Sequence, residues 1–401
     1  MNESIHRPNE RLCSPLSRAE LERRWAAARD AMTDIDALLV QGACNLAGTG
    51  GYFRWFTGVS VGTSYPQTLV FPRDGLMTIA GHGPFDGDTV LDGNDPALPG
   101  VGRRLSAPSF PAVDYTGGYD ATLVARAIEQ GGYRRIGLIS PNTTSFGFAT
   151  RLMQAVPDAT FLDATGRIDP LKAVKSAEEI VLIRRAAAMQ DEILTRMRDH
   201  IRPGLKDFEI MAQAQYLGQL LGSETGYFLG SSGAPGQPTA IRPRREQGRE
   251  MRPGDILYLQ AENTGPGGYF THVGRYFVLG KAPQELVDAF GAMVEAQAHT
   301  LKLLKPGASC RDVFAEHNAY MRARGFPAET RLHCHGQGYD VVERPLIRND
   351  EDMLLTTNMN IGLHPSFGNA RMFVTVCDNF LIGPDGAVER LHQLPYDIVE
   401  L

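Results

Sequence analysis

The sequence predicts an α+β protein of two domains, with an N-terminal α/β domain over residues 1–165 and a C-terminal α+β domain over residues 170–401. The length of 401 residues fits two or three domains of ordinary size. Strand-like and helix-like segments alternate in the first part of the chain. In the second part, two pairs of helices are interleaved with strand runs. The boundary is expected within residues 164–175.

The first domain begins with a predicted helix over residues 18–32, which Ser17 is placed to cap. Pro72-Arg73-Asp74-Gly75, between the apolar segments 68–71 and 76–80, is typical of a hairpin turn. The other expected elements are strands at 35–40, 136–140 and 160–162 and helices near 120–130 and 146–155. This alternation favours a partly parallel sheet. Neither GxGxxG after a strand nor GxxxxGK(S/T) occurs, so we predict no nucleotide site.

The second domain opens with a long predicted helix, because Ser176 and Glu179 form a capping-box pattern and Pro203-Gly204 ends the apolar repeat. Further helices are expected at 207–221, 283–303 and 310–324, and strands at 255–262, 269–279, 331–335, 359–364 and 372–382. We expect the helices on one face of a curved sheet. The loop 231–250 is rich in Gly, Pro and Arg and is predicted to be a surface segment or a lid.

The composition excludes several classes of protein. Hydrophobic residues make up 43% and charged residues 21%, as in soluble globular proteins, and the net charge of −6 disfavours nucleic-acid binding. No apolar run is long enough to span a membrane, and the first twelve residues do not resemble a signal peptide. The five cysteines are scattered: Cys13, Cys44, Cys310, Cys334 and Cys377. We therefore expect a cytoplasmic protein that acts on a small molecule and binds neither nucleic acid nor membrane.

Polar and titratable residues gather on the predicted strands of the second domain. His333 and His335 alternate on one strand and should share a face, as should Gln260 and Glu262 on another. Other members of the set are His272 within a strand, His364 at a strand end and Cys377 in mid-strand. A single buried histidine or thiol is ordinary in a protein core. Several in one sheet favour a catalytic cleft.

Motifs from residue 175 to the C-terminus resemble the creatinase/prolidase/methionine aminopeptidase family. They are Lys175-Ser176-Ala177-Glu178-Glu179, Gly254-Asp255-Ile256-Leu257, Gly268-Tyr269, Arg275, Lys305-Pro306-Gly307, and His335-Gly336-Gln337-Gly338 followed by Glu343 and Pro345. The resemblance implies a C-terminal pita-bread catalytic domain and, as in the creatinase and prolidase branch, an N-terminal α/β domain. Peptidases of this family hold two divalent metal ions with two Asp, one His and two Glu.

Four of those five ligand positions are changed here. The first Asp falls at Gln260–Glu262, the second is His272, the His is kept as His335, and the two Glu are His364 and Cys377. Only Glu262 could supply a carboxylate, so repulsion between two dications would go largely uncompensated. We predict no metal cofactor. The alternative is one Zn, Fe or Cu ion on His272, His335, His364 and Cys377.

Without a metal, side chains must carry the chemistry. His335 is the preferred general base, and His272 or His364 could orient it or protonate the leaving group. Glu262 could orient an imidazole or hold a cationic substrate group. Cys377 is either a nucleophile of lowered pKa or a structural thiol.

Substrate-binding candidates are Glu343, Arg371, Tyr339 and Gln260. Glu343 could buttress the His335 strand or be a solvated turn residue, and Arg371 could clamp a carboxylate. Arg242, Arg244, Arg245 and Arg249 form either a solvated face or another clamp. Tyr227, Phe228 and Tyr339 line either a pocket or the core.

The resemblance also implies a homodimer, because Phe53, Trp55 and Phe56 resemble a loop that reaches the partner's cleft in the creatinase branch. Residues that creatinases and prolidases use on substrate fall on Gly236-Gln237-Pro238, Gly274 and Val342, so their substrates cannot be carried over. We predict a hydrolase of a carbon–nitrogen (amide or amidine) bond in a small polar non-peptide. The alternatives are a mononuclear-metal enzyme related to dimethylsulfoniopropionate lyase, and a non-catalytic interaction module or degenerate Xaa-Pro peptidase.

Overall fold

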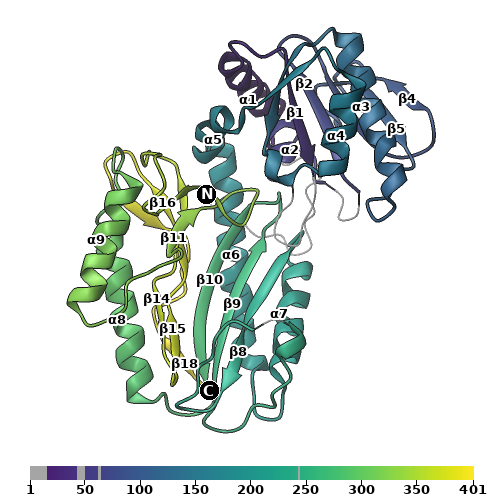
Figure 1. The fold of residues 1–401 in the computed structure, drawn as a ribbon. Coiled ribbons are helices and arrows are strands. Elements are labelled where there is room, and N and C mark those ends of the chain that lie inside the picture. Colours follow the sequence, from purple (N-terminus) through teal and green to yellow (C-terminus); the bar gives the residue numbers. More distant parts are fainter. Residues whose placement is uncertain (1–15, 43–49, 62–64, 243) are drawn as a thin grey trace. The chain divides into compact units, whose positions relative to one another are not determined.

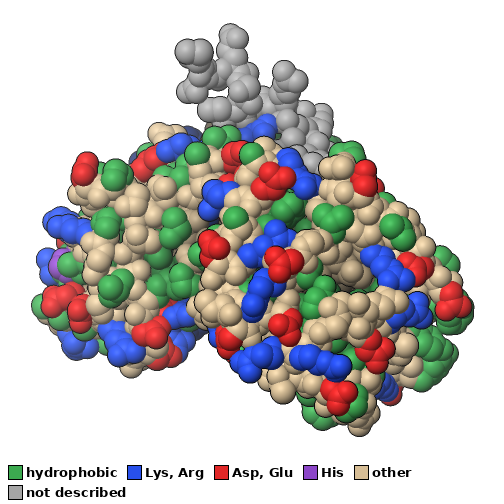
Figure 2. Space-filling model, turned by 90° about the horizontal axis from the view of Figure 1, so that it is seen from above, with side chains coloured by type: hydrophobic (Ala, Val, Ile, Leu, Met, Phe, Trp, Pro, Cys, Tyr) green, Lys and Arg blue, Asp and Glu red, His purple; other side chains and the backbone are tan. Residues whose placement is uncertain are grey.

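The computed structural model describes residues 16–42, 50–61, 65–242 and 244–401. These residues divide into two compact units, one ending at Lys172 and the other spanning Ala173–Leu401 (Figure 1). Cys13 and Cys44 lie outside the described residues. On the face drawn in Figure 2, Lys and Arg side chains are interspersed with Asp and Glu side chains. In the part of the chain that is described, no helix has the length and hydropathy to cross a bilayer.

The first unit is built on a mixed seven-stranded sheet with the order β4-β5-β3-β2-β1-β6-β7. β1 pairs antiparallel with β2 and parallel with β6, and β3 pairs parallel with β5, so the predicted α/β class with a partly parallel sheet is confirmed. Ser17 caps the first helix by accepting from the backbone N–H of Glu20. The bounds are α1 Arg18–Ala31, β1 Ala37–Gly42, α2 Gly51–Thr57, β2 Gln67–Pro72, β3 Met77–His82, β4 Gly87–Val90, β5 Val101–Ala107, α3 Gly117–Gly131, β6 Arg135–Ile139, α4 Phe146–Ala155, β7 Thr160–Asp163 and α5 Thr165–Ala173.

The segment expected to reach a partner subunit lies instead in the core of its own unit. Phe53, Trp55 and Phe56 belong to helix α2, and each is at most 1% exposed. The ring of Phe56 packs against Phe71 of β2, with the centroids 4.9 Å apart. Burial of these large apolar rings stabilises the unit, so the expectation that they contact a partner's cleft is wrong.

The second unit contains a four-stranded sheet, β18-β10-β9-β8, and a five-stranded sheet, β12-β11-β13-β16-β17, with a separate β14-β15 hairpin. An isolated bridge between Gly274 and Cys377 joins β10 to the segment before β16. The bounds are α6 Ala177–His200, α7 Asp207–Leu220, β8 Gly226–Gly233, β9 Ile256–Thr264, β10 Phe270–Val278, α8 Gln284–Leu301, α9 Cys310–Ala323, β11 Cys334–Gly336, β12 Glu343–Leu346, β13 Asn360–Leu363, β14 Ser366–Gly368, β15 Phe373–Thr375, β16 Asp378–Ile382, β17 Val388–Arg390 and β18 Ile398–Glu400.

The helices lie along both sides of the strands, α6 and α7 on one side and α8 and α9 on the other (Figure 1). Leu257, Leu259 and Ala261 of β9 pack in one apolar cluster with α6 and α7. The α9 residues Cys310 and Val313 pack against the five-stranded sheet. The alternate residues of β9 therefore point away from α6 and α7, and this second face carries the polar site.

One loop prediction and one strand prediction needed correction. The predicted loop 231–250 begins inside strand β8, where Ser231 pairs with Tyr258. A Cβ on Gly230 would lie 2.8 Å from the carbonyl carbon of Tyr258, so the glycine at this position allows β8 and β9 to approach each other closely. The predicted strand 372–382 is two strands, β15 and β16, and Cys377 lies in the break between them.

Candidate active site

Three histidines from three different strand segments meet in the second unit. His272 comes from β10, His335 from β11 and His364 from the residue after β13. Their ring centroids lie 5.4 Å (His272–His335), 5.3 Å (His272–His364) and 5.2 Å (His335–His364) apart. His272 and His335 are buried and His364 is partly buried. The structure thus brings together the three histidines that fall at family ligand positions, and we call them the histidine triangle.

Glu262 lies beside the triangle because it pairs directly with His272 in the β9–β10 register. Its Oε1 is 3.4 Å from Nδ1 of His272, and its Oε2 accepts a hydrogen bond from Nε2 of Gln260 at 3.2 Å. The hydroxyl of Tyr258 donates to Oε1 of Gln260 at 2.6 Å, which fixes the amide orientation. A side chain at Gly274 would overlap this hydroxyl group, since a Cβ there lies 2.8 Å from Tyr258 Cζ. β9 therefore presents Tyr258, Gln260 and Glu262 as one hydrogen-bonded row.

A network of three amides, which sequence analysis did not find, holds the backbone of His272. The backbone N–H of His272 donates to Oδ1 of Asn379 at 2.8 Å, so Nδ2 of Asn379 is the donor on its other side. That nitrogen donates to Oε1 of Gln337 at 2.8 Å and to Oδ1 of Asn360 at 2.9 Å. The available sequence signal was an asparagine at the first position of β13 and another at the second position of β16, with a glutamine directly after β11.

The ionisable groups of the site have pKa values shifted by burial and by one another. Burial, together with the neighbouring imidazoles, lowers the pKa of His335 to about 4 and that of His364 well below its usual range. Burial alone would raise the pKa of Glu262, but the hydrogen bond from His272 and the nearby His335 outweigh it and lower that pKa. At neutral pH the site therefore combines an ionised Glu262 with uncharged His335 and His364.

The nucleophile interpretation of Cys377 is not supported. The thiol is fully buried, and burial, followed by the carboxylates of Glu262 and Asp378, raises its pKa well above the usual value. A protonated thiol is a poor nucleophile. Its backbone carbonyl accepts from the N–H of Gly274 at 3.1 Å and from Nη1 of Arg275 at 3.3 Å, which indicates a structural position.

Glu343 and Tyr339 lie in the frame that supports the His335 strand. Glu343 is 7% exposed and accepts from Nζ of Lys175 at 3.0 Å and from the backbone N–H of Asp340 at 3.0 Å, so it is not a solvated turn residue. It pairs with Gly336 in the β11–β12 ladder, next to His335. Tyr339 is buried and stacks on Tyr269 with the centroids 4.2 Å apart. A direct contact of either residue with substrate stays a prediction.

The arginine candidates lie in other ion pairs. Arg371, with a side chain 66% exposed, pairs with Glu285 at 3.1 Å. Arg249 forms two hydrogen bonds with Asp255, at 2.6 and 2.8 Å. Each guanidinium thus contacts a carboxylate of the protein, and a role of either residue as a substrate clamp stays a prediction.

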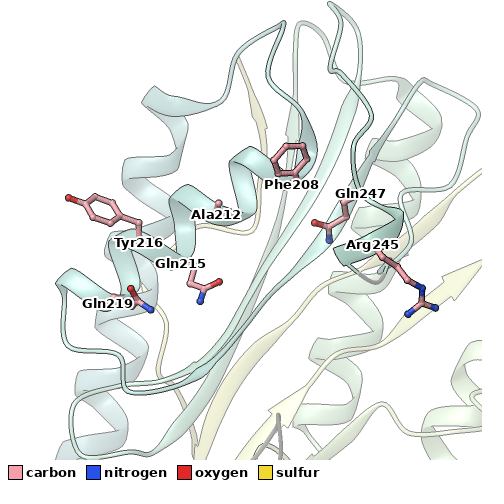
Figure 3. Close-up of a pocket in the computed structure, with 7 residues that line it drawn as sticks. All are labelled: Phe208, Ala212, Gln215, Tyr216, Gln219, Arg245 and Gln247. Atoms are coloured by element: carbon pink, nitrogen blue, oxygen red, sulfur yellow. The ribbon is translucent and has the colours of Figure 1, made fainter. Parts of the chain in front are cut away.

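Arg245 borders a surface pocket of about 590 Å³ on the outer side of α7. Figure 3 shows its guanidinium extending away from that helix. The pocket residues do not include any candidate catalytic residue; they are Phe208, Ala212, Gln215, Tyr216, Gln219, Arg245 and Gln247.

His333 does not join the triangle. It precedes β11 and stacks on His317 of α9, with the ring centroids 3.6 Å apart. Nδ1 of His317 donates to Oγ1 of Thr300 at 2.8 Å, because the Thr300 hydroxyl itself donates to the carbonyl of Ala296. The expected shared face of His333 and His335 is wrong because the backbone bends before the strand begins.

The donor set does not fit a pair of divalent ions. The five family ligand positions supply one carboxylate, Glu262, together with three imidazoles and the thiol of Cys377. Within the described ranges, no three His, Cys, Asp or Glu side chains are placed to hold a metal ion. Two adjacent dications would lack compensating negative charge here.

Comparison with known proteins identifies relatives of this chain in sequence and in fold. Residues 181–384 match metallopeptidase family M24. The probable dipeptidase PepE of Mycobacterium tuberculosis is 25% identical over 240 residues, or 59% of this chain and 63% of that protein. A Bacillus creatinase is 22% identical over 384 residues, or 89% of this chain and 85% of that protein. The chain thus matches less than two thirds of the length of PepE.

A solved structure, the X-Pro aminopeptidase of Thermotoga maritima, superimposes with a TM-score of 0.76 at 18% identity. The match covers 95% of this chain and 99% of that one. The expected creatinase/prolidase-like family and its two-domain pita-bread fold are confirmed.

Proposed function

The chain belongs to metallopeptidase family M24, and from that premise we propose that it is a hydrolase of a carbon–nitrogen bond, amide or amidine, in a small polar non-peptide. We propose further that it works without the dinuclear metal centre. The observation that carries this proposal is the histidine triangle beside a single carboxylate, at the positions where peptidases of the family place metal ligands.

His335 is the proposed general base. Its Nδ1–H donates to the backbone carbonyl of Gly336 at 2.9 Å, which leaves Nε2 with a lone pair that can take a proton from water. With a pKa of about 4, the ring is uncharged throughout the neutral range. The low pKa also makes it a weak base, and the negative charge of Glu262 offsets this by favouring the imidazolium as it forms.

The reaction then balances as an ordinary hydrolysis. The water oxygen bonds to the substrate carbon while His335 takes its proton, and the carbon–nitrogen bond breaks as the nitrogen receives a proton back. That proton is the one His335 took from water, delivered from the His335 imidazolium directly or relayed through His364 or His272, since both rings lie next to His335. Glu262 orients His272 through the Nδ1 contact.

The test is a turnover screen of cyclic amides, amidines, betaines and dipeptides with the wild type and His335→Gln. His200→Gln, at the end of α6 and outside the triangle, is the matched control. We expect turnover of a non-peptide in the presence of a chelator, loss in His335→Gln and retention in His200→Gln. Dipeptide turnover that requires two divalent ions per chain would refute the proposal.

A mononuclear-metal lyase is the second candidate, favoured by Nε2 of His272, which is buried without a hydrogen-bond partner. Elemental analysis of purified protein distinguishes the two, because the lyase requires one stoichiometric Zn, Fe or Cu ion. A homodimer, proposed from the family resemblance, is tested by sedimentation.

A further inference from the structure

Glu262 differs from the buried carboxylates of Asp378 and Glu343 in its charge environment. Asp378 is paired with Arg275 at 2.8 Å and with Arg390 at 2.8 Å, and Glu343 is paired with Lys175 at 3.0 Å. Among the ion pairs of the described residues, Glu262 has a contact with His272 and none with Lys or Arg. Its negative charge is therefore not balanced by a permanent cation.

The groups that contact Glu262 are an amide and an imidazole. On its own strand the neighbour is the amide of Gln260, and on β10 it is the ring of His272. Nδ1 of His272 also lies 3.4 Å from Nε2 of Gln337, so Glu262 and this amide share one ring nitrogen. Neither the amide nor the imidazole carries the permanent positive charge of a lysine or arginine.

Burying an uncompensated carboxylate costs several kcal/mol, and a fold tolerates that cost where a bound group removes it. The side chain of Glu262 is 14% exposed, whereas that of His272 is 1% exposed. The carboxylate is thus the part of this pair that an incoming molecule can reach. Each carboxylate oxygen uses one contact, to His272 or to Gln260, and has capacity for a second donor.

We propose that the substrate of this site is an organic monocation with N–H donors, an amidinium or ammonium compound, whose charge pairs with Glu262. This inference rests on the proposed function and names its substrate class. One carboxylate neutralises one positive charge, so a monocation leaves the site neutral, whereas an anion would meet direct repulsion. A neutral amide of the same shape would leave the carboxylate uncompensated.

The experiment measures binding separately from turnover. Chelator-treated full-length protein is titrated calorimetrically with acetamidinium, with its neutral isostere acetamide and with acetate. The wild type is compared with Glu262→Gln and with Glu389→Gln, a control that removes one partner of the exposed Arg184–Glu389 pair. Circular dichroism and melting temperature verify folding of each variant.

We expect acetamidinium to bind the wild type and Glu389→Gln at least about tenfold more tightly than acetamide or acetate. In Glu262→Gln this preference should disappear while the melting temperature stays equal or rises, because an uncompensated buried charge has been removed. Equal binding of acetamide, or unchanged acetamidinium binding in Glu262→Gln, would overturn the inference. So would acetamidinium binding that appears only after one metal ion per chain is restored.

The two proposals fail differently. If acetamidinium binds through Glu262 but no carbon–nitrogen substrate is hydrolysed, the hydrolase proposal fails and the cation site stands. If neutral amides are hydrolysed through His335 with no preference for cations, the substrate-class inference fails alone.

Discussion

Gly362 lies against the ring of His272, and its replacement by alanine tests the placement of the histidine triangle. Gly362 pairs with His335 across β13 and β11. An added Cβ would lie 2.6 Å from Cε1 of His272 and would also overlap Nε2 of the same ring. Carbon atoms in contact normally lie about 3.5–4.0 Å apart, so the ring would have to move by about 1 Å.

His272 has little room to move. Its backbone N–H is held by Asn379 at 2.8 Å, and its ring faces His335 and His364 at centroid distances of 5.4 and 5.3 Å. Overpacking of a tight core costs about 1–3 kcal/mol. For a unit of this size, each kcal/mol corresponds to about 2–4 °C in melting temperature. A displacement of about 1 Å at a catalytic group lowers the rate roughly 100-fold.

The assay compares wild type, Gly362→Ala and Gly291→Ala by urea denaturation, and by turnover once a substrate is known. Gly291 lies in α8, and a Cβ there meets no atom within 4 Å, so alanine should stabilise the helix by up to about 1 kcal/mol. We expect a lower urea midpoint only for Gly362→Ala. An unchanged midpoint and unchanged turnover in that variant would refute the argument that Gly362 limits the position of His272.

Three other predictions concern charge and burial. Lys175→Met leaves Glu343 charged and buried, and should lower the free energy of unfolding by about 3–5 kcal/mol in urea titrations. Adding Glu343→Gln should recover part of this lost stability. No recovery in the double variant would argue against a stabilising Lys175–Glu343 ion pair. Burial lowers the pKa of His317 to about 4, below the unfolded value of 6.5, so the folded state binds fewer protons. The neutral His317 ring therefore contributes on the order of 3 kcal/mol to the free energy of unfolding above pH 6.5, and this contribution is lost as the pH falls toward 4. Urea midpoints measured at pH 7, 5.5 and 4.5 should fall with pH in the wild type and fall less in His317→Asn. An equal decrease of the midpoint with pH in both proteins would contradict this prediction. Cys377 should resist iodoacetamide at pH 8 in the native protein and react in urea, since burial raises its pKa; mass spectrometry after digestion measures this, and rapid native labelling would restore the nucleophile interpretation.

Local sequence patterns correctly predicted features that depend on interactions between residues close together in the chain. Ser176 and Glu179 form the predicted capping box, with reciprocal hydrogen bonds at the start of α6. Gln260 and Glu262 share a strand face and are hydrogen-bonded. In both cases the interacting residues are two or three positions apart, so the spacing alone determines their contact.

Patterns failed where distant segments decide the environment. Arg371 pairs with Glu285 of α8, a contact that its local sequence did not predict. His333 was assigned to the face of His335, but it stacks on His317. Phe53 and Trp55 were assigned to an interface, but they are core residues of α2. Each partner or environment is set by packing between elements, which no local spacing encodes.

By itself, the sequence determined the family, the presence of a lone carboxylate and three histidines at the ligand positions, and the strand face that Gln260 and Glu262 share. The tertiary structure alone decided that β10, β11 and β13 bring His272, His335 and His364 to ring separations of 5.2–5.4 Å, and that Asn379 holds the first of them. The physical reason is that alternation along a strand sets only the direction of a side chain. Its neighbours depend on the register between strands that lie far apart in the chain.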